Sequence, residues 1–165
     1  MNFSKDPIAT TITIAKNASS INLNSYIYAN CTTADNIGLS AVRFNITNAS
    51  GSLVTQNNTL NFSSIIYQAV NGTGTYNISC WVNDTSGNSN FSTTSFSVSD
   101  PTLPTACFDA ILANTIYTLQ NDIITSSSPC ISVTANNVTI NTNGFNITGT
   151  SWADQGISIM ANYTT

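Results

Sequence analysis

The stretch from Gly72 to Asn88 constrains the fold more than any other part of the sequence. Its apolar residues recur at every second position: Tyr76, Ile78, Cys80 and Val82. A period of two places these side chains on one face of a β-strand and their neighbours on the other. Residues 84–88, Asp-Thr-Ser-Gly-Asn, have turn chemistry, and a second run suited to a strand follows at 91–98. We therefore expect a β-hairpin whose first strand points Cys80 into a core.

Several other runs in the first hundred residues have the β-branched and aromatic character of strands. These runs are residues 6–15, 21–23, 25–32, 39–47, 53–55 and 60–70. Asn, Gly and Ser separate them, and no stretch shows a helical period. About seven short strands divided by turns predict a β-sandwich over residues 1–99.

The charge content excludes several classes of function. Lys5, Lys16 and Arg43 face seven Asp, with no Glu and no His, and the net charge is −4. Such a chain lacks the basic surface that binds nucleic acid or docks on anionic membranes. No apolar run reaches the roughly 20 residues of a membrane span, and the first residues lack the apolar stretch of a signal peptide. The polar content also fits disorder, but the regular apolar spacing favours a folded chain.

The four cysteines predict an oxidising compartment. They are Cys31, Cys80, Cys107 and Cys130, without C-x-x-C spacing and without a His that would help to bind zinc. An even number of cysteines in a β-rich chain favours two disulfides. Three connectivities are open, and 31–80 with 107–130 keeps each bridge inside one expected domain. Four buried free thiols are the alternative.

Fourteen asparagines stand in the N-x-S/T triplet that accepts N-linked glycans. They are Asn2, Asn17, Asn30, Asn45, Asn48, Asn57, Asn61, Asn71, Asn77, Asn83, Asn90, Asn137, Asn146 and Asn162. Chance alone, with 24 Asn and 47 Ser plus Thr in 165 residues, gives 24 × 47/165, or about seven. The sequence holds about twice that number.

The phase of the strands places several of these asparagines on the surface. Val42, Phe44 and Ile46 set an inward phase that leaves Asn45 pointing out. The same reasoning applies to Asn77, Asn83, Asn137 and Asn146. A glycan needs an exposed asparagine, so we expect several sites to carry glycans, which would cover a weakly charged surface and protect edge strands.

A second pattern begins after a short proline-containing segment. Pro101 and Pro104 lie in residues 100–106 and predict a short, fairly stiff linker. Residues 107–165 then hold very short apolar runs, each broken by Asn or Gly. One such strand buries little, but stacked coils of them bury a continuous apolar column. A second small sandwich or hairpin is the alternative for this region.

Residues 7–99 resemble the immunoglobulin-like modules of bacterial and archaeal surface proteins. The resemblance rests on Cys31 and Cys80 and on the ending Gly-Thr-Tyr-x-Ile-x-Cys-x-Val-x-Asp-x-x-Gly-Asn. The antibody pattern differs, because Tyr76 lies four residues before Cys80 rather than two, and no Trp lies on the expected third strand. Trp81 falls on the outward face, where a neighbouring strand, a glycan or a ligand would cover it.

Residues 107–160 resemble the start of right-handed parallel β-helix proteins of the pectate-lyase-like type. The carrying motifs are Tyr-Thr-Leu-x-x-Asp-Ile from Tyr117, and Cys-Ile-x-Val-x-Ala-Asn-Asn-Val-Thr-Ile-Asn-x-Asn-Gly-Phe-x-Ile-x-Gly from Cys130. A coil of this class takes roughly 20 to 25 residues, so about two coils fit. The last coil would leave an apolar end and unpaired edges in water. We therefore expect a fragment of a longer β-helix, or a subunit that another one continues.

The sequence predicts no catalytic residue. The β-helix resemblance implies lyase chemistry with acidic calcium ligands and a basic residue, but residues 107–165 hold Asp109, Asp122 and Asp154 and no Lys, Arg or His. Paired-carboxylate hydrolysis needs two acids close together, and isolated turn positions are the simpler interpretation of these three. A calcium site at Asp84 or Asp100 is the alternative to turn roles there. We expect no cofactor.

These observations together predict an all-β, extracellular, glycosylated structural or adhesive module without catalytic activity. It is similar to large surface or S-layer-associated proteins of archaea, with copies of itself, other surface proteins or carbohydrate as expected partners. The alternative is a filament subunit joined by strand exchange at residues 8–15 or 156–160. A second alternative is a non-catalytic fragment of a carbohydrate-active β-helix enzyme whose catalytic coils lie beyond residue 165.

Overall fold

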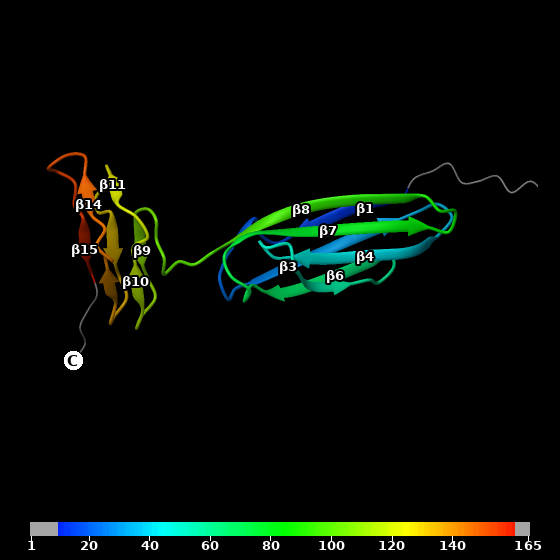
Figure 1. Cartoon of the computed structure of the whole chain (residues 1–165), viewed down its shortest axis with the longest axis horizontal. Helices are drawn as coiled ribbons and strands as arrows, with labels where there is room; N and C mark the ends of the chain where they lie inside the picture. Colours follow the sequence, from blue (N-terminus) through cyan, green and yellow to red (C-terminus); the bar gives the residue numbers. More distant parts are fainter. Residues whose placement is uncertain (1–9, 161–165) are drawn as a thin grey trace, which may run out of the picture. The chain divides into compact units, whose positions relative to one another are not determined.

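The computed structural model describes residues 10–160, which form strands and turns. The predicted all-β class is confirmed, and within these residues no helix is long and apolar enough to cross a membrane. The chain divides into two compact units, Met1–Ser99 and Asp100–Thr165 (Figure 1). Each unit has its own cluster of buried residues.

Unit 1 is an immunoglobulin-like sandwich of two sheets. Its strands are β1 (Thr11–Lys16), β2 (Ser20–Asn22), β3 (Tyr26–Ala34), β4 (Leu39–Thr47), β5 (Leu53–Asn57), β6 (Phe62–Gln68), β7 (Gly74–Asp84) and β8 (Ser89–Ser99). One sheet has the order β1-β3-β6 and the other β2-β8-β7-β4-β5. Figure 1 shows the long strands running side by side. All neighbours are antiparallel except β2 and β8.

The core of unit 1 follows the alternation in β7. Tyr76, Ile78, Cys80 and Val82 are all 0% exposed. Tyr76 packs between two rings, with centroids 6.0 Å from Tyr67 and 5.2 Å from Phe96. Its hydroxyl donates to the Gly72 carbonyl at 2.8 Å, which satisfies the only polar atom of a buried side chain.

The turn from β7 to β8 is organised by one carboxylate. Asp84 is 2% exposed, and its Oδ1 accepts hydrogen bonds from the amides of Ser86 (2.8 Å) and Asn88 (2.7 Å). Gly87 has a φ of 87°, which glycine adopts without steric cost. The predicted hairpin turn at residues 84–88 is confirmed.

Several expected strands of unit 1 have different bounds in the structure. The run at 60–70 becomes a strand only at Phe62, because Asn61 has a left-handed φ of 68° that interrupts an extended backbone. The apolar patch at 21–23 overlaps β2, which ends at Asn22 and pairs in parallel with the distant β8. Of the expected first strand, the part before residue 10 lies outside the described residues.

Unit 2 is the start of a parallel β-helix. Its strands are β9 (Phe108–Ala110), β10 (Ile116–Thr118), β11 (Ile123–Thr125), β12 (Ile131–Val133), β13 (Thr139–Asn141), β14 (Ile147–Gly149) and β15 (Ile157–Ile159). They form three parallel sheets with the orders β15-β12-β9, β10-β13 and β11-β14. Strands β9–β11 make one coil, β12–β14 the next, and β15 begins a third.

The register of these sheets gives the length of a coil. Phe108 pairs with Ile131 and Ile116 with Thr139, a step of 23 residues in each case. The step is 24 from Ile123 to Ile147 and 26 from Ile131 to Ile157. Buried side chains such as Ile123 and Ile131 fill the interior. Each strand is only three residues long, so the stacking of coils rather than any single strand supplies the core.

Equivalent corners of the two coils are joined by a pair of asparagines. Asn114 and Asn137 both have a left-handed φ, of 55° and 53°. The Nδ2 of Asn137 donates to the Oδ1 of Asn114 at 2.9 Å. Asparagine tolerates this backbone conformation, and its short amide reaches the adjacent coil. These two residues therefore fix the corner as well as link the coils.

The segment expected to be a linker pairs with the first coil. The amide of Thr118 donates to Thr102 O at 2.8 Å, and that of Gln120 donates to Pro104 O at 3.2 Å. The Nδ2 of Asn121 donates to Thr105 O at 3.1 Å. A first coil has no earlier coil to accept these donors, so the segment caps part of its edge. Proline offers no N–H, but its carbonyl still accepts.

Candidate functional site

The first disulfide fastens the sandwich. Cys31 on β3 and Cys80 on β7 lie in different sheets, and their Cα atoms are 6.4 Å apart. Both residues are 0% exposed. The bridge crosses the centre of the core, between the two strands that the sequence resemblance indicated.

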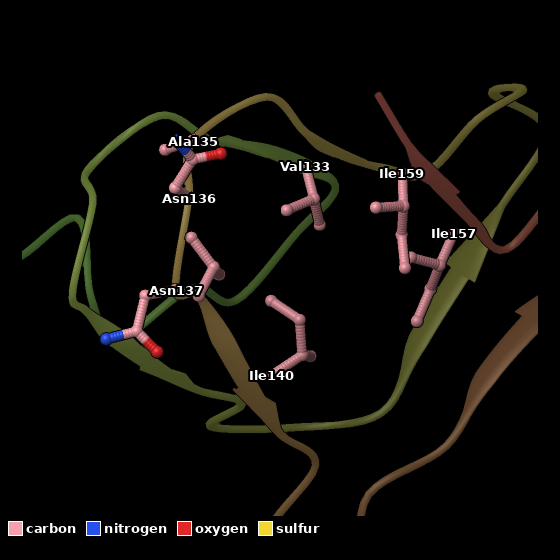
Figure 2. Close-up of a pocket in the computed structure, with 8 residues that line it drawn as sticks. Val133, Ala135, Asn136, Asn137, Ile140, Ile157 and Ile159 are labelled. Atoms are coloured by element: carbon pink, nitrogen blue, oxygen red, sulfur yellow. The ribbon is translucent and has the colours of Figure 1, made fainter. Parts of the chain in front are cut away.

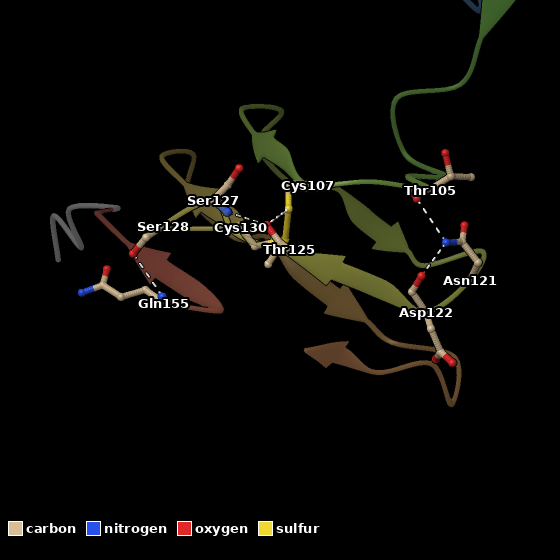
Figure 3. The surroundings of a disulfide bond; sticks show 9 residues. All are labelled: Thr105, Cys107, Asn121, Asp122, Thr125, Ser127, Ser128, Cys130 and Gln155. Atoms are coloured by element: carbon tan, nitrogen blue, oxygen red, sulfur yellow. Dashed lines mark hydrogen bonds between the residues drawn. A yellow bond between two sulfur atoms is a disulfide. The ribbon is translucent and has the colours of Figure 1, made fainter. Parts of the chain in front are cut away.

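The second disulfide fastens consecutive coils. Cys107 precedes β9 and Cys130 precedes β12, with Cα atoms 4.7 Å apart (Figure 3). The Oγ1 of Thr125, a buried residue, lies 3.0 Å from Cys107 Sγ and accepts the amide of Ser127 at 2.8 Å. A disulfide sulfur carries no proton, so the hydroxyl is the donor in the contact with sulfur. The predicted pairing of four cysteines in two disulfides is confirmed.

Every sequon asparagine in the described residues reaches the surface. Asn17, Asn61, Asn71, Asn77, Asn137 and Asn146 are exposed. Asn30, Asn45, Asn48, Asn57, Asn83 and Asn90 are half-buried. Asn2 and Asn162 lie outside the described residues. Strand alternation accounts for exposed Asn77, whereas Asn45 and Asn83 are less exposed than their phase alone indicated. Six of the twelve lie outside the strands, namely Asn17, Asn48, Asn61, Asn71, Asn137 and Asn146.

An apolar hollow of about 300 Å³ opens beside the third coil. It is lined by Val133, Ala135, Asn136, Asn137, Val138, Ile140, Ile157 and Ile159. Figure 2 shows Val133, Ile140, Ile157 and Ile159 directed into it. The third coil begins at β15, and no described residue stacks on β13 or β14 on their outer side. The hollow is therefore the part of the β-helix interior that lacks a covering coil.

Three side chains on the outer face of the larger sheet form a row across neighbouring strands, which the sequence alone did not predict. Arg43 on β4, Trp81 on β7 and Phe91 on β8 are direct cross-strand partners. Phe91 is 58% exposed, and Trp81 is half-buried. The outward position of Trp81 was expected from its phase. Phe91 is likewise out of phase with Phe96, but only the register brings these residues together.

The carboxylates of unit 2 hold turns and corners. Asp122 Oδ1 accepts the amide of Asn146 at 2.8 Å. Asp154 Oδ2 accepts the amide of Ser151 at 2.8 Å and the hydroxyl of Thr150 at 3.2 Å. Asp109 is exposed on β9. Asp122 and Asp154 therefore each accept a backbone amide in a different turn or corner.

The two aspartates considered for calcium have turn roles as well. Burial alone would raise the pKa of the Asp84 carboxyl, but hydrogen bonds from the Asn88 side chain and from turn amides outweigh it and lower the pKa. Asp100 Oδ1 accepts the amide and hydroxyl of Thr102, at 2.9 and 2.7 Å. Among the described residues, no three His, Cys, Asp or Glu side chains gather as a metal site would require.

Comparison with known proteins gives distant similarities to solved structures. No protein-family model and no curated protein matches the chain. The PKD1 domain of the Vibrio cholerae metalloprotease PrtV is similar at 16% identity, over 56% of this chain and 99% of that chain, with a TM-score of 0.40. The PKD1 domain of Vibrio anguillarum Epp gives 20% identity, 58% and 100% coverage, and a TM-score of 0.41.

A pectate lyase, Pel3 from Pectobacterium carotovorum, is also similar. The identity is 14%, the match covers 81% of this chain and 44% of that chain, and the TM-score is 0.32. All three TM-scores are below 0.5. The assignment of a sandwich followed by β-helix coils therefore rests on the strand pairing and disulfides of the chain itself.

Proposed function

We propose that this chain is an extracellular structural module whose surface carries N-linked glycans. The observation that supports this most is the surface position of all twelve sequon asparagines among residues 10–160. The excess of sequons over chance supports the same proposal. Charged residues make up only 6% of the chain, so glycans would supply the solubility that charge does not.

The two disulfides support an oxidising location for this module. Each joins separate parts of a small core: the two sheets of unit 1 and the first two coils of unit 2. Small domains with this kind of bridge are typical of extracellular proteins. We propose a structural or adhesive role rather than catalysis, and the acceptor roles of Asp122 and Asp154 in a corner and a turn support this proposal.

This proposal is tested by secretion from a host that N-glycosylates proteins. Intact mass would be measured before and after enzymatic removal of glycans, and before and after reduction. We expect a mass excess of several glycans and no free thiol until reductant is added. A secreted chain with the bare polypeptide mass would contradict the proposal, and free thiols in the folded chain would contradict its compartment.

The second candidate function is that of a subunit that assembles with other copies through the open face of its last described coil, at β13, β14 and β15, here called the coil end. The apolar hollow and the one-sided strands β13, β14 and β15 favour it. Of the two joints expected from the sequence, the C-terminal one fits, since within residues 10–160 β15 pairs with β12 alone. At the N-terminal joint, residues 8–9 lie outside the described residues, and Thr11 to Lys16 pair along their whole length with β3 of the same chain, so exchange there stays a prediction.

Electron microscopy of the glycosylated chain would separate the two candidates. Regular fibres that contain folded subunits would favour assembly through the coil end. Dispersed particles at high protein concentration would favour the extracellular structural module without assembly.

A further inference from the structure

The row of Arg43, Trp81 and Phe91 borders a hollow on the outer face of the larger sheet. The hollow measures about 480 Å³ and is lined by these three residues together with Asn45 and Ser79. Residues in register across neighbouring strands have Cβ atoms roughly 4.5–5.5 Å apart, so the three side chains form one continuous surface. This surface is open and shallow rather than a closed cavity.

One wall of this hollow is itself a sequon asparagine. Asn45 pairs with Ser79 in the row next to Arg43 and Trp81, and it is half-buried. Ile46, at 0% exposure, anchors the strand inward, so Asn45 and the sequon residue Thr47 share the outer face. The acceptor amide for a glycan thus lies at the edge of an aromatic surface.

The chemistry of the hollow suits a sugar. A pyranose ring has an apolar face of C–H groups, which packs on aromatic rings such as those of Trp81 and Phe91. Its rim of hydroxyls needs hydrogen-bond partners, and the Arg43 guanidinium offers five N–H donors. A covalently attached sugar also loses little translational freedom on binding, which makes even a weak contact effective.

We propose that the first sugars of a glycan on Asn45 occupy this hollow and stack on Trp81 and Phe91. This inference rests on the proposed glycosylation and names its structural role at one site. Asn77 and Asn83 share the outer face of β7, but among the sequon asparagines of residues 10–160 Asn45 alone lines the hollow. The glycan would cover the aromatic row and so protect the centre of the sheet's outer face.

The experiment uses Trp81 as its own reporter. The chain has two tryptophans, and Trp152 is fully exposed, so Trp152→Phe leaves Trp81 as the only one. The full chain with this change would be secreted from an N-glycosylating host whose glycans begin with N-acetylglucosamine. Glycopeptide mass spectrometry would give the occupancy of Asn45, and acrylamide quenching would give the exposure of Trp81.

Two variants remove the glycan in different ways, and two serve as controls. Asn45→Gln removes the acceptor, and Thr47→Ala removes the sequon while keeping Asn45. Asn83→Gln removes a neighbouring sequon on the same face, and Asn146→Gln removes an exposed one in unit 2. We expect the glycan at Asn45 to lower the quenching constant of Trp81 by about half relative to both glycan-free variants, because it would cover the open face of the ring.

The outcomes separate this inference from the proposed function. Equal quenching with and without an occupied Asn45 would overturn the inference and leave the proposed function standing. Occupied sites elsewhere with Asn45 empty would do the same. A chain without glycans at any site would overturn both. Quenching that changes equally in Asn83→Gln would also overturn the assignment to Asn45.

Discussion

At the scale of single residues, two buried polar side chains set the geometry of β7. Tyr76 closes the turn before the strand through Gly72, and Asp84 closes the turn after it through Ser86 and Asn88. Both side chains are buried and hydrogen-bonded to backbone groups of these turns. Loss of either side chain would leave backbone groups without a partner, which lowers the free energy of unfolding.

Removal of the Tyr76 hydroxyl tests the first of these contacts. Tyr76→Phe keeps the ring stacking and leaves the Gly72 carbonyl without its partner, so we expect a loss of about 1 kcal/mol in the free energy of unfolding. Urea denaturation would measure it, with Tyr28→Phe, at an exposed position, as the control. Equal stability of Tyr76→Phe and the wild type would contradict the role of this bond.

Tyr76 also predicts how stability changes in alkali. Burial, with Tyr67 nearby, raises the pKa of Tyr76 from 10.0 to about 12. A raised pKa in the folded chain means that its contribution is complete below pH 10.0 and is lost as pH rises toward about 12. Thermal unfolding across this range should show a steeper loss in the wild type than in Tyr76→Phe. Parallel curves would contradict it.

The stability that Asp84 contributes depends on pH in the opposite direction. Its pKa is lowered in the folded chain, so the unfolded chain binds more protons at acid pH. Its contribution is therefore complete above the usual carboxyl range and is lost as pH falls through the lowered pKa. We expect Asp84→Asn to flatten the acid limb of the unfolding midpoint against pH. Asp109→Asn, at an exposed position, is the control, and an acid limb equally steep in Asp84→Asn and the wild type would contradict this role.

At the scale of elements, the alternation of apolar residues predicted the strands, but it could not give their register. The inward phase of Tyr76, Ile78 and Val82 is a local property of the chain and was readable from the sequence. The row of Arg43, Trp81 and Phe91 depends on which residues of three strands face one another, and parity alone does not specify this.

The capping segment was missed for a related reason. Pro101 and Pro104 indicate a break in regular structure, but the sequence does not show that the carbonyls of Thr102 and Pro104 accept donors from the first coil. Similarly, the parallel pairing of β2 with β8 joins residues far apart in the chain. Three-residue strands carry too little pattern to predict such partners.

The disulfides should contribute according to the loops that they close. Cys31 and Cys80 are 49 residues apart, and Cys107 and Cys130 are 23 apart. Loop closure then gives about 4 kcal/mol for the first and about 3 kcal/mol for the second. Urea denaturation of the paired alanine variants, each compared with the wild type, would measure both. A negligible loss of unfolding free energy in either variant would contradict the stabilising role of the disulfide removed in it.

At the scale of the whole molecule, the two units have separate cores, and these cores differ in how fully they are covered from solvent. The sheets of unit 1 enclose a core on both sides, whereas the interior of unit 2 meets solvent at the hollow beside β15. Ile159 is 71% exposed there, with Ile157 at 46%. An apolar surface of this kind is an association site or an aggregation hazard.

A charge in the hollow should reduce self-association. Ile159→Asp places a carboxylate among the apolar residues of the hollow, so we expect a lower sedimentation coefficient at high protein concentration than for the wild type. Ile124→Asp, at a residue 75% exposed on β11 and outside the hollow, is the matched control. If both variants and the wild type sediment alike, the coil end is not an association surface.

The measurement that tests the proposed function most directly is a site-resolved glycan map of the secreted chain. We expect occupancy at several of the twelve described sequons, in both units, with the exposed asparagines such as Asn77 and Asn146 among them. Glycans would then form part of the native surface, in agreement with the exposed or half-buried positions of these asparagines. An empty map from a host that glycosylates its other secreted proteins would contradict the proposal, and the asparagines would then be ordinary polar surface residues.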